Sequence, residues 1–181
     1  MKKLVLGMLL ASGSLTAMAA ENEPSNNWVG GISYINLSDE DDGLAISLGG
    51  VVGSLGYKIK SGNNFYLIPE VRIGTGISDD SVSYSGVDVD VELDGFLALS
   101  LRGQFELDNG VYLFAAPTYA NTEFTVTVSD GGQSASATED SWELGVGGGV
   151  GYNFTKTASA EVMYEQFDGT DVFSLGLKFN F

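Results

Sequence analysis

Regular alternation of apolar and polar residues is the feature that most limits what this chain can fold into. Between Val87 and Leu107 the odd positions are Val, Leu, Gly or Phe, whereas most even positions are charged or polar. The same period of two returns in residues 65–74, 142–154 and 173–181. Successive side chains of a β-strand point to opposite faces, so this period predicts strands. No segment beyond the first twenty residues keeps a helical period, and we therefore predict an all-β protein.

The connections between the predicted strands alternate in length. Three are short and built from turn-forming residues, at 61–64, 108–110 and 155–157. The other four are longer and acidic, at 38–43, 78–86, 129–137 and 168–171. Short turns at one end and long loops at the other are typical of outer-membrane barrels. We predict an eight-stranded antiparallel up-and-down transmembrane β-barrel with strands at 27–37, 44–60, 65–77, 87–107, 111–128, 138–154, 158–167 and 172–181.

The first residues have the composition of an export signal. Lys2 and Lys3 precede the apolar run Leu4–Leu10, which is too short to span a membrane as a helix. Ala17 and Ala19 fit the small-residue pattern of a cleavage site. The predicted divisions are a cleaved signal peptide over 1–19, a short periplasmic segment over 20–26 and an outer-membrane barrel domain over 27–181.

Composition excludes several classes of function. The chain has no Cys and no His, which rules out disulfides, thiolate metal sites and catalytic machinery built on a His base. A net charge of −16 with eight Lys and Arg residues argues against nucleic acid as a partner. Without a His base, Glu161 and Glu165 are the carboxylate pair that would have to perform acid–base catalysis. A structural role in ion pairs explains these two carboxylates better. We predict that the protein is not an enzyme and has no cofactor.

The polar face of the strands carries a balanced set of charges within an otherwise acidic chain. A solvated surface has no need of such balance, whereas a narrow barrel interior does, because buried charges must be paired. We therefore predict that the polar face lines the lumen and that the apolar face meets lipid. The predicted lumen charge network consists of Lys58, Glu70, Arg72, Arg102, Glu143, Glu161, Glu165 and Lys178.

Four glycines, Gly145, Gly147, Gly149 and Gly151, share the polar face of one strand. Eight strands enclose a space just wide enough for side chains to fill, so we predict a plugged lumen. The glycines would then make room for larger lumen side chains. Alternatively, they leave a narrow polar cavity, which would favour a small cation-preferring pore; a hydrophobic-ligand conduit is a further alternative. The larger side chains expected opposite them are Glu161, Met163, Glu165 or Arg102.

The chain ends in the alternating strand Val172–Phe181. With the signal peptide and the eight strands, it resembles the small outer-membrane β-barrel family, which includes the OmpA transmembrane domain, OmpX and Ail, and NspA and Opa. The resemblance implies the outer membrane of a Gram-negative bacterium, surrounded by membrane lipid and lipopolysaccharide. It also implies that the barrel-assembly machinery reads Phe179 and Phe181. An even number of strands with short periplasmic turns places both termini in the periplasm.

Acidic residues gather in the four longer connections, which should lie outside the cell. No Lys or Arg accompanies them, so we expect a strongly negative rim. One explanation is solubility and repulsion between neighbours; another is loosely bound Ca²⁺ or Mg²⁺ that bridges carboxylates to lipopolysaccharide phosphates. No EF-hand pattern occurs, so no metal site is defined. The predicted acidic rim consists of Asp39, Glu40, Asp41, Asp42, Asp79, Asp80, Asp88, Asp90, Glu92, Asp94, Asp130, Glu139 and Asp140.

Family members serve as adhesins, structural anchors, serum-resistance factors or small pores, so the resemblance leaves the function open. The run 87–107 is about twice the length of a membrane strand. Its upper half and residues 81–84 should project as one hairpin, and residues 124–138 as a second. An exposed sheet edge recruits partner strands, unless Asp88 and Asp90 prevent such pairing. We predict a surface structural or adhesin-like protein that contacts an extracellular protein through its acidic loops.

Overall fold

The computed structural model describes residues 27–41, 44–84, 87–130 and 133–181. The predicted signal peptide over 1–19 and the segment 20–26 lie outside these residues. Within them, no helix is long and apolar enough to cross a membrane. They form ten strands: β1 (Trp28–Asp41), β2 (Leu44–Tyr57), β3 (Ile59–Lys60), β4 (Phe65–Ser78), β5 (Asp80–Tyr84), β6 (Val87–Glu106), β7 (Val111–Asp130), β8 (Gln133–Asn153), β9 (Ala158–Gln166) and β10 (Thr170–Asn180).

Eight of these strands close into an antiparallel barrel. The order around the barrel is β4-β2-β1-β10-β9-β8-β7-β6, and the pairing of β4 with β6 completes the circle. β3 continues the line of β2 along β4, with Ile59 opposite Leu67. β5 folds back on β6 as a hairpin arm. The predicted all-β, eight-stranded antiparallel barrel is therefore confirmed.

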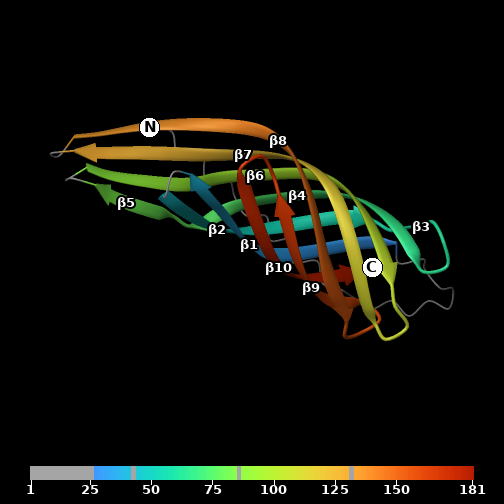
Figure 1. The fold of residues 1–181 in the computed structure, drawn as a ribbon. Coiled ribbons are helices and arrows are strands. Elements are labelled where there is room, and N and C mark those ends of the chain that lie inside the picture. Colours follow the sequence, from blue (N-terminus) through green and yellow to red (C-terminus); the bar gives the residue numbers. More distant parts are fainter. Residues whose placement is uncertain (1–26, 42–43, 85–86, 131–132) are drawn as a thin grey trace.

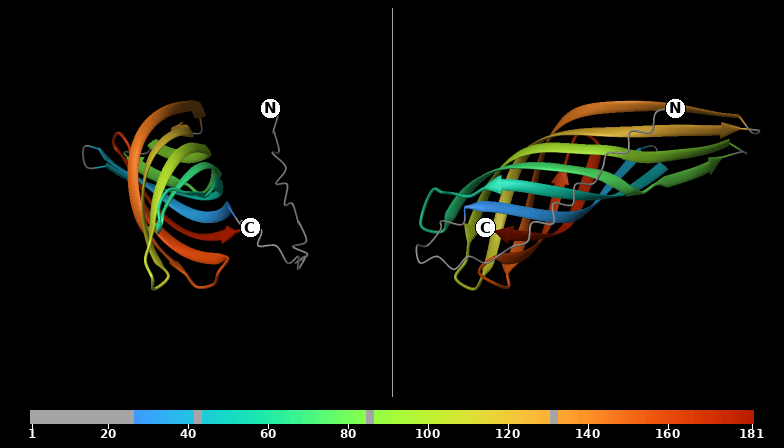
Figure 2. Two further views of the ribbon diagram at one scale, coloured as in Figure 1. Left: turned by 90° about the vertical axis from the view of Figure 1, so that its right-hand side faces the viewer. Right: turned by 180° about the vertical axis from the view of Figure 1, so that it is seen from behind.

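The two ends of the barrel differ in shape (Figure 1). At one end, here named the short-turn end, lie the turns after β3, β6 and β8 and the backbone pairing of Trp28 with Phe181, with N···O distances of 3.2 and 3.0 Å. At the other, the extended end, β5 and the ends of β6, β7 and β8 project beyond the remaining strands. Figure 2 shows the same projection from behind. The projecting part is one antiparallel sheet in the order β5-β6-β7-β8.

Most of the described residues in the four longer connections belong to strands, which corrects their interpretation as loops; Asp168 and Gly169 form the bend between β9 and β10. β1 runs to Asp41, four residues past its predicted end, and β8 begins at Gln133 rather than at residue 138. Asp130 of β7 lies opposite Gln133, so that ladder continues to the tip of the hairpin. The two projecting hairpins expected from the sequence are both present. Strand pairing continues here because it satisfies backbone groups beyond the membrane as well as within it.

A β-bulge in β6 divides this strand into two parts with opposite facing. The register against β7 shifts between Leu93 and Gly95. On the short-turn side of the bulge the even residues are buried, as at Phe96 and Arg102, whereas Leu93 is buried on the other side. The sequence pattern predicts that the odd residues of 87–107 share one face along the whole run. This prediction is wrong, because the odd residues face inward on one side of the bulge and outward on the other. The extra residue of a bulge reverses the side on which following side chains lie.

Polar and apolar residues separate between the inside and the outside of the barrel. Buried polar residues, among them Glu70 and Thr118, point into the lumen. Exposed apolar side chains cover the outer wall, as at Ile73 and Leu99. Aromatic side chains lie on the outer wall near both ends, and Tyr119 stacks on Trp142 with 4.8 Å between ring centroids. This inverted distribution is that of a protein whose outer wall meets lipid.

The glycines of β8 give the lumen side chains their room. A Cβ on Gly147 would collide with the side chain of Glu165 and lie 2.7 Å from the carbonyl oxygen of Tyr164. A Cβ on Gly151 would collide with the ring of Tyr112. The corresponding side chains at Gly145 and Gly149 are Phe167 and Phe114. Of the larger side chains predicted from the sequence, Glu165 contacts Gly147 most closely, and Glu161 and Met163 lie opposite Gly151 and Gly149 in the register with β9. The aromatic rings of Phe167, Phe114 and Tyr112 occupy the space beside the other three glycines.

We expect Gly147→Ala to destabilise the folded barrel by about 1–3 kcal/mol, because the added methyl group displaces Glu165 from its ion pair. Gly53→Ala on β2 is the matched control, since its nearest contact is 3.9 Å away at the carbonyl oxygen of Ile73. Denaturant unfolding in lipid vesicles measures both variants. Equal stability of the two variants would contradict the tight fit between β8 and β9.

Candidate functional site

The lumen holds ion pairs in layers, and the first contains Arg72 and Glu165. Two guanidinium nitrogens of Arg72 contact the two carboxylate oxygens of Glu165 at 2.6 and 2.7 Å. Thr118 donates its hydroxyl to Glu165 Oε1 at 2.8 Å. Glu165 has no exposed side-chain surface, and each of its two carboxylate oxygens accepts a hydrogen bond inside the barrel. Such a bidentate ion pair fixes the relative orientation of the two side chains as well as neutralising their charges.

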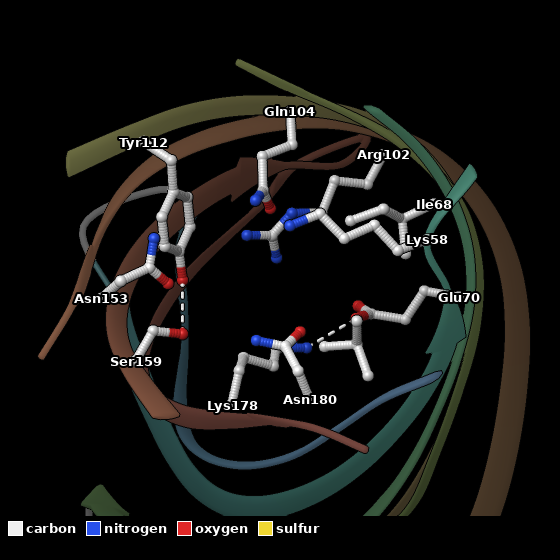
Figure 3. Close-up of a pocket in the computed structure, with 11 residues that line it drawn as sticks. Lys58, Ile68, Glu70, Arg102, Gln104, Tyr112, Asn153, Ser159, Lys178 and Asn180 are labelled. Atoms are coloured by element: carbon white, nitrogen blue, oxygen red, sulfur yellow. Dashed lines mark hydrogen bonds and ion pairs between the residues drawn. The ribbon is translucent and has the colours of Figure 1, made fainter. Parts of the chain in front are cut away.

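The second layer lies nearer the short-turn end and joins the charges of Glu70, Arg102, Glu161 and Lys178. Figure 3 draws three of these side chains, Glu70, Arg102 and Lys178. Arg102 contacts both oxygens of Glu161 at 2.6 and 3.1 Å and lies 3.5 Å over the ring of Phe114. Lys178 Nζ contacts Glu70 at 2.6 Å and lies 3.6 Å from Glu161. These side chains come from β4, β6, β7, β9 and β10, so the layer links strands around the barrel.

The outermost pair at the short-turn end is Lys58 with Glu106, and it corrects one member of the predicted network. Gln104 donates to the same carboxylate at 3.2 Å. Glu143 takes no part in these ion pairs: its carboxylate accepts a hydrogen bond from Ser141 at 3.3 Å, nearer the extended end. The network therefore has four bases and four acids, but Glu106 replaces Glu143. Glu106 lies on the polar face of the run 87–107, and this position is the sequence feature that could have indicated its membership of the network.

Above the ion pairs, toward the extended end, apolar side chains close the lumen. Ile35, Val52, Phe96, Phe167 and Val172 belong to one buried cluster. The two cavities among the ion pairs measure about 20 and 10 Å³, which is room for about one water each. Side chains thus fill the described lumen, as expected for eight strands. This filling disfavours both the pore and the hydrophobic-ligand conduit.

The predicted rim acids are spread over the extended end. Asp79, Asp90, Glu92, Glu139 and Asp140 are exposed. No group of three acids suited to hold a metal ion occurs among the described residues. Two further acids have polar contacts and six lie outside the residues whose side chains are described. The contacts are Asp80 with the Ser47 amide at 2.8 Å and Asp94 with the Thr125 hydroxyl; the six are Asp39, Glu40, Asp41, Asp42, Asp88 and Asp130.

The projecting sheet has two different faces. Residues opposite each other on paired strands share a face, so Val91 with Val126, and Leu93 with Phe124, lie on the inner face that continues the lumen wall. The outer face carries acids and hydroxyls: Asp90, Glu92, Asp94, Thr125, Thr127, Ser136, Thr138 and Asp140. Thr127 and Ser136 hydrogen-bond each other at 3.0 Å across that face.

The first part of β8 is an edge of this sheet. β8 pairs with β7 from Gln133 onward, but its pairing with β9 begins at Val146. Among the described residues, the backbone over 133–145 is therefore paired along one side. Every side chain from Gln133 to Trp142 is exposed. The edge is thus open to solvent along most of the projecting hairpin.

The chain matches the family model described as the outer membrane protein beta-barrel domain over residues 5–181. It belongs to this outer-membrane β-barrel family. The family places the protein in the outer membrane of a Gram-negative bacterium, in contact with membrane lipid. Membership also supports the prediction of a structural or surface protein rather than an enzyme. None of the curated protein sequences matches this chain significantly.

Solved structures of other transmembrane β-barrels share the fold. Ail, the attachment invasion locus protein of Yersinia pestis, is 19% identical with a TM-score of 0.57, and the match covers 86% of this chain and 98% of Ail. Neisserial surface protein A is 15% identical with a TM-score of 0.55, over 85% of this chain and 97% of that chain. A de novo designed transmembrane β-barrel is 12% identical with a TM-score of 0.51, over 90% and 100%.

We expect Arg102→Ala to lower the free energy of unfolding by about 3–5 kcal/mol, because it leaves Glu161 buried without its main partner. Lys60→Ala, at an exposed site on β3, should change it by less than about 0.5 kcal/mol. Denaturant unfolding in lipid vesicles gives both values. An unchanged midpoint for Arg102→Ala would mean that this guanidinium is solvated.

Proposed function

We propose that this outer-membrane barrel is a surface interaction protein and that the free edge of β8 pairs with a strand of an extracellular protein. The open backbone over 133–145 carries the proposal, because unpaired N–H and C=O groups in an exposed strand are a template for another strand. The names of two proteins with this fold, an attachment invasion locus protein and a neisserial surface protein, agree with a surface role.

The residues along this edge do little to prevent pairing. Residues 133–138 are Gln, Ser, Ala, Ser, Ala and Thr, with no charge and no Pro. Natural sheets usually protect such edges with Lys, Pro, a bulge or a covering segment. Asp88 and Asp90, expected from the sequence to oppose pairing, lie on β6 between β5 and β7, away from the β8 edge. An edge that is open over 133–145 and uncharged over 133–138 supports a binding role.

The charge at the extended end favours a basic or neutral partner. The exposed acids Asp90, Glu92 and Asp140 lie on the outer face of the projecting sheet. No Lys or Arg is among the residues of this sheet. Ail was crystallised with the heparin analogue sucrose octasulfate, a polyanion. We infer that the present chain, whose projecting sheet is acidic, does not share that preference, because like charges repel.

The proposal requires the extended end to face the outside of the cell and both termini to face the periplasm. Short turns on the periplasmic side are the rule in bacterial barrels. Phe179 and Phe181 face outward at the short-turn end, where the assembly machinery would read them. Lipopolysaccharide would then surround the acidic outer face of the sheet, with Ca²⁺ or Mg²⁺ loosely held between carboxylates and phosphates.

Single cysteines test this orientation directly, because the chain has no Cys of its own. We expect a membrane-impermeant maleimide to label Ser136→Cys on intact cells. Asn109→Cys, in the turn between β6 and β7, should react only after the outer membrane is permeabilised. Labelling of Asn109→Cys alone on intact cells would reverse the orientation and remove the basis of the surface role.

Single prolines test pairing at the β8 edge. Consecutive residues direct their N–H groups to opposite sides of a strand, so one of Ser136→Pro and Ala137→Pro removes an N–H from the free side. An edge strand tolerates that substitution. Against the protein in nanodiscs, a random phage-displayed peptide library should yield extended peptides rich in Lys or Arg. The tolerated proline should weaken their binding about tenfold, which corresponds to one or two ladder hydrogen bonds.

Ser136→Lys provides a second blocking variant that retains the backbone N–H, and Asn109→Lys at the opposite end is its matched control. Circular dichroism and the heat-modifiable migration of folded barrels establish which variants are folded. Full peptide binding by the folded proline and lysine variants would exclude the β8 edge as the binding surface.

A further inference from the structure

A cavity of about 250 Å³ lies between the mouth of the barrel and the inner face of the projecting sheet. It is more than ten times as large as either cavity among the ion pairs, which measure about 20 and 10 Å³. Its position at the extended end separates it from the ion-pair network. The residues that line it are Leu37, Ser38, Leu48, Val91, Phe124, Val126, Glu139 and Thr170.

The floor and walls of this cavity are apolar. Leu37 and Leu48 are 4% and 3% exposed and belong to the buried cluster that closes the lumen. Val91 and Phe124 pack against the same cluster. Val126, above them on β7, is still 36% exposed. Exposed apolar side chains next to a buried apolar cluster form a surface whose burial by another apolar group is favourable in free energy.

The polar edge of the cavity carries negative charge. Glu139 of β8 lines it directly, together with the hydroxyl-bearing Ser38 and Thr170. Each Lys and Arg among the described residues lies either in the ion-pair network or, as with Lys60 and Lys156, at the short-turn end. The field at the cavity mouth therefore favours a cation and opposes an anion.

We propose that this cavity binds a small amphiphilic cation, whose apolar chain or ring lies against Leu37, Leu48 and Phe124 and whose positive group lies beside Glu139. An apolar protein cavity of about 150 Å³ holds a benzene molecule. The cavity of about 250 Å³ therefore accommodates a short alkyl chain or one ring together with part of a cationic head group. Because the cavity lies on the inner face of the sheet, the inference stands independently of strand pairing at the β8 edge.

Hexyltrimethylammonium is a suitable probe, because it combines a short alkyl chain with a fixed positive charge. Its binding to the protein in nanodiscs of zwitterionic lipid can be measured by isothermal titration calorimetry, with empty nanodiscs as the reference for partition into lipid. Hexyl sulfate and hexanol provide the anionic and neutral comparisons. We expect the cation to bind more tightly than hexanol, and hexyl sulfate to bind more weakly than hexanol.

Two variants separate the carboxylate from the apolar lining. Glu139→Gln should weaken binding of hexyltrimethylammonium about three- to fivefold, as expected for one partly exposed ion pair, and leave hexanol unchanged. Asp140→Asn is the matched control, since Asp140 follows Glu139 on the strand but lies on the outer face. Val126→Trp should fill the cavity and abolish binding of the cation and hexanol alike.

Equal effects of Glu139→Gln and Asp140→Asn would show a general attraction of the acidic end rather than a site. Equal or tighter binding of hexyl sulfate would point instead to the acyl chain of an anionic lipid. Either result overturns the proposal, as does unchanged binding to a folded Val126→Trp barrel. None of these results bears on labelling of Ser136→Cys or on peptide capture by β8, so the surface role is judged separately.

Discussion

Each charge inside this narrow barrel requires an opposite charge within contact distance, and the rest of the structure depends on that requirement. Four bases and four acids meet it through pairs contributed by strands from around the barrel. The bidentate ion pairs of Arg72 with Glu165 and of Arg102 with Glu161 require well-defined side-chain positions. The glycines of β8 leave the space in which the lumen side chains pack. The resulting ion-pair network is neutral and the lumen around it is filled, so we expect binding functions at the surface and at the extended end.

The bulge in β6 determines what the extended end presents to its surroundings. Without the register shift between Leu93 and Gly95, the alternation would direct Asp90, Glu92 and Asp94 inward, beside the apolar cluster. Burial of three unpaired carboxylates there would cost far more free energy than a local break in the ladder. The bulge instead places these acids on the outer face and sends Val91 and Leu93 inward. One extra residue thus gives the sheet an acidic outside and an apolar inside.

The architecture and most of the lumen could be predicted from the sequence because both follow from local patterns. A period of two specifies strands, and a balanced polar face in an acidic chain specifies a lumen. Which acid faces which base depends on the register between strands distant in sequence, such as β4 and β9, and no local pattern carries that information. Glu106 and Glu143 both lie on the polar side of a strand, and their heights along the barrel decide that Glu106 joins the network. The bulge was missed because Asp94 and Gly95 continue the alternation of residue types.

A sheet that leaves the membrane as a single layer cannot bury its apolar face against a second layer of its own chain. Here the apolar cluster at the mouth covers part of that face, and Val126 and Val128 remain 36% and 41% exposed above it. The free edge of β8 and the cavity beside Glu139 are two consequences of this incomplete burial. A partner strand would extend the sheet laterally, whereas a ligand in the cavity would cover the inner face. Both would stabilise the projecting hairpins without any change in the barrel below.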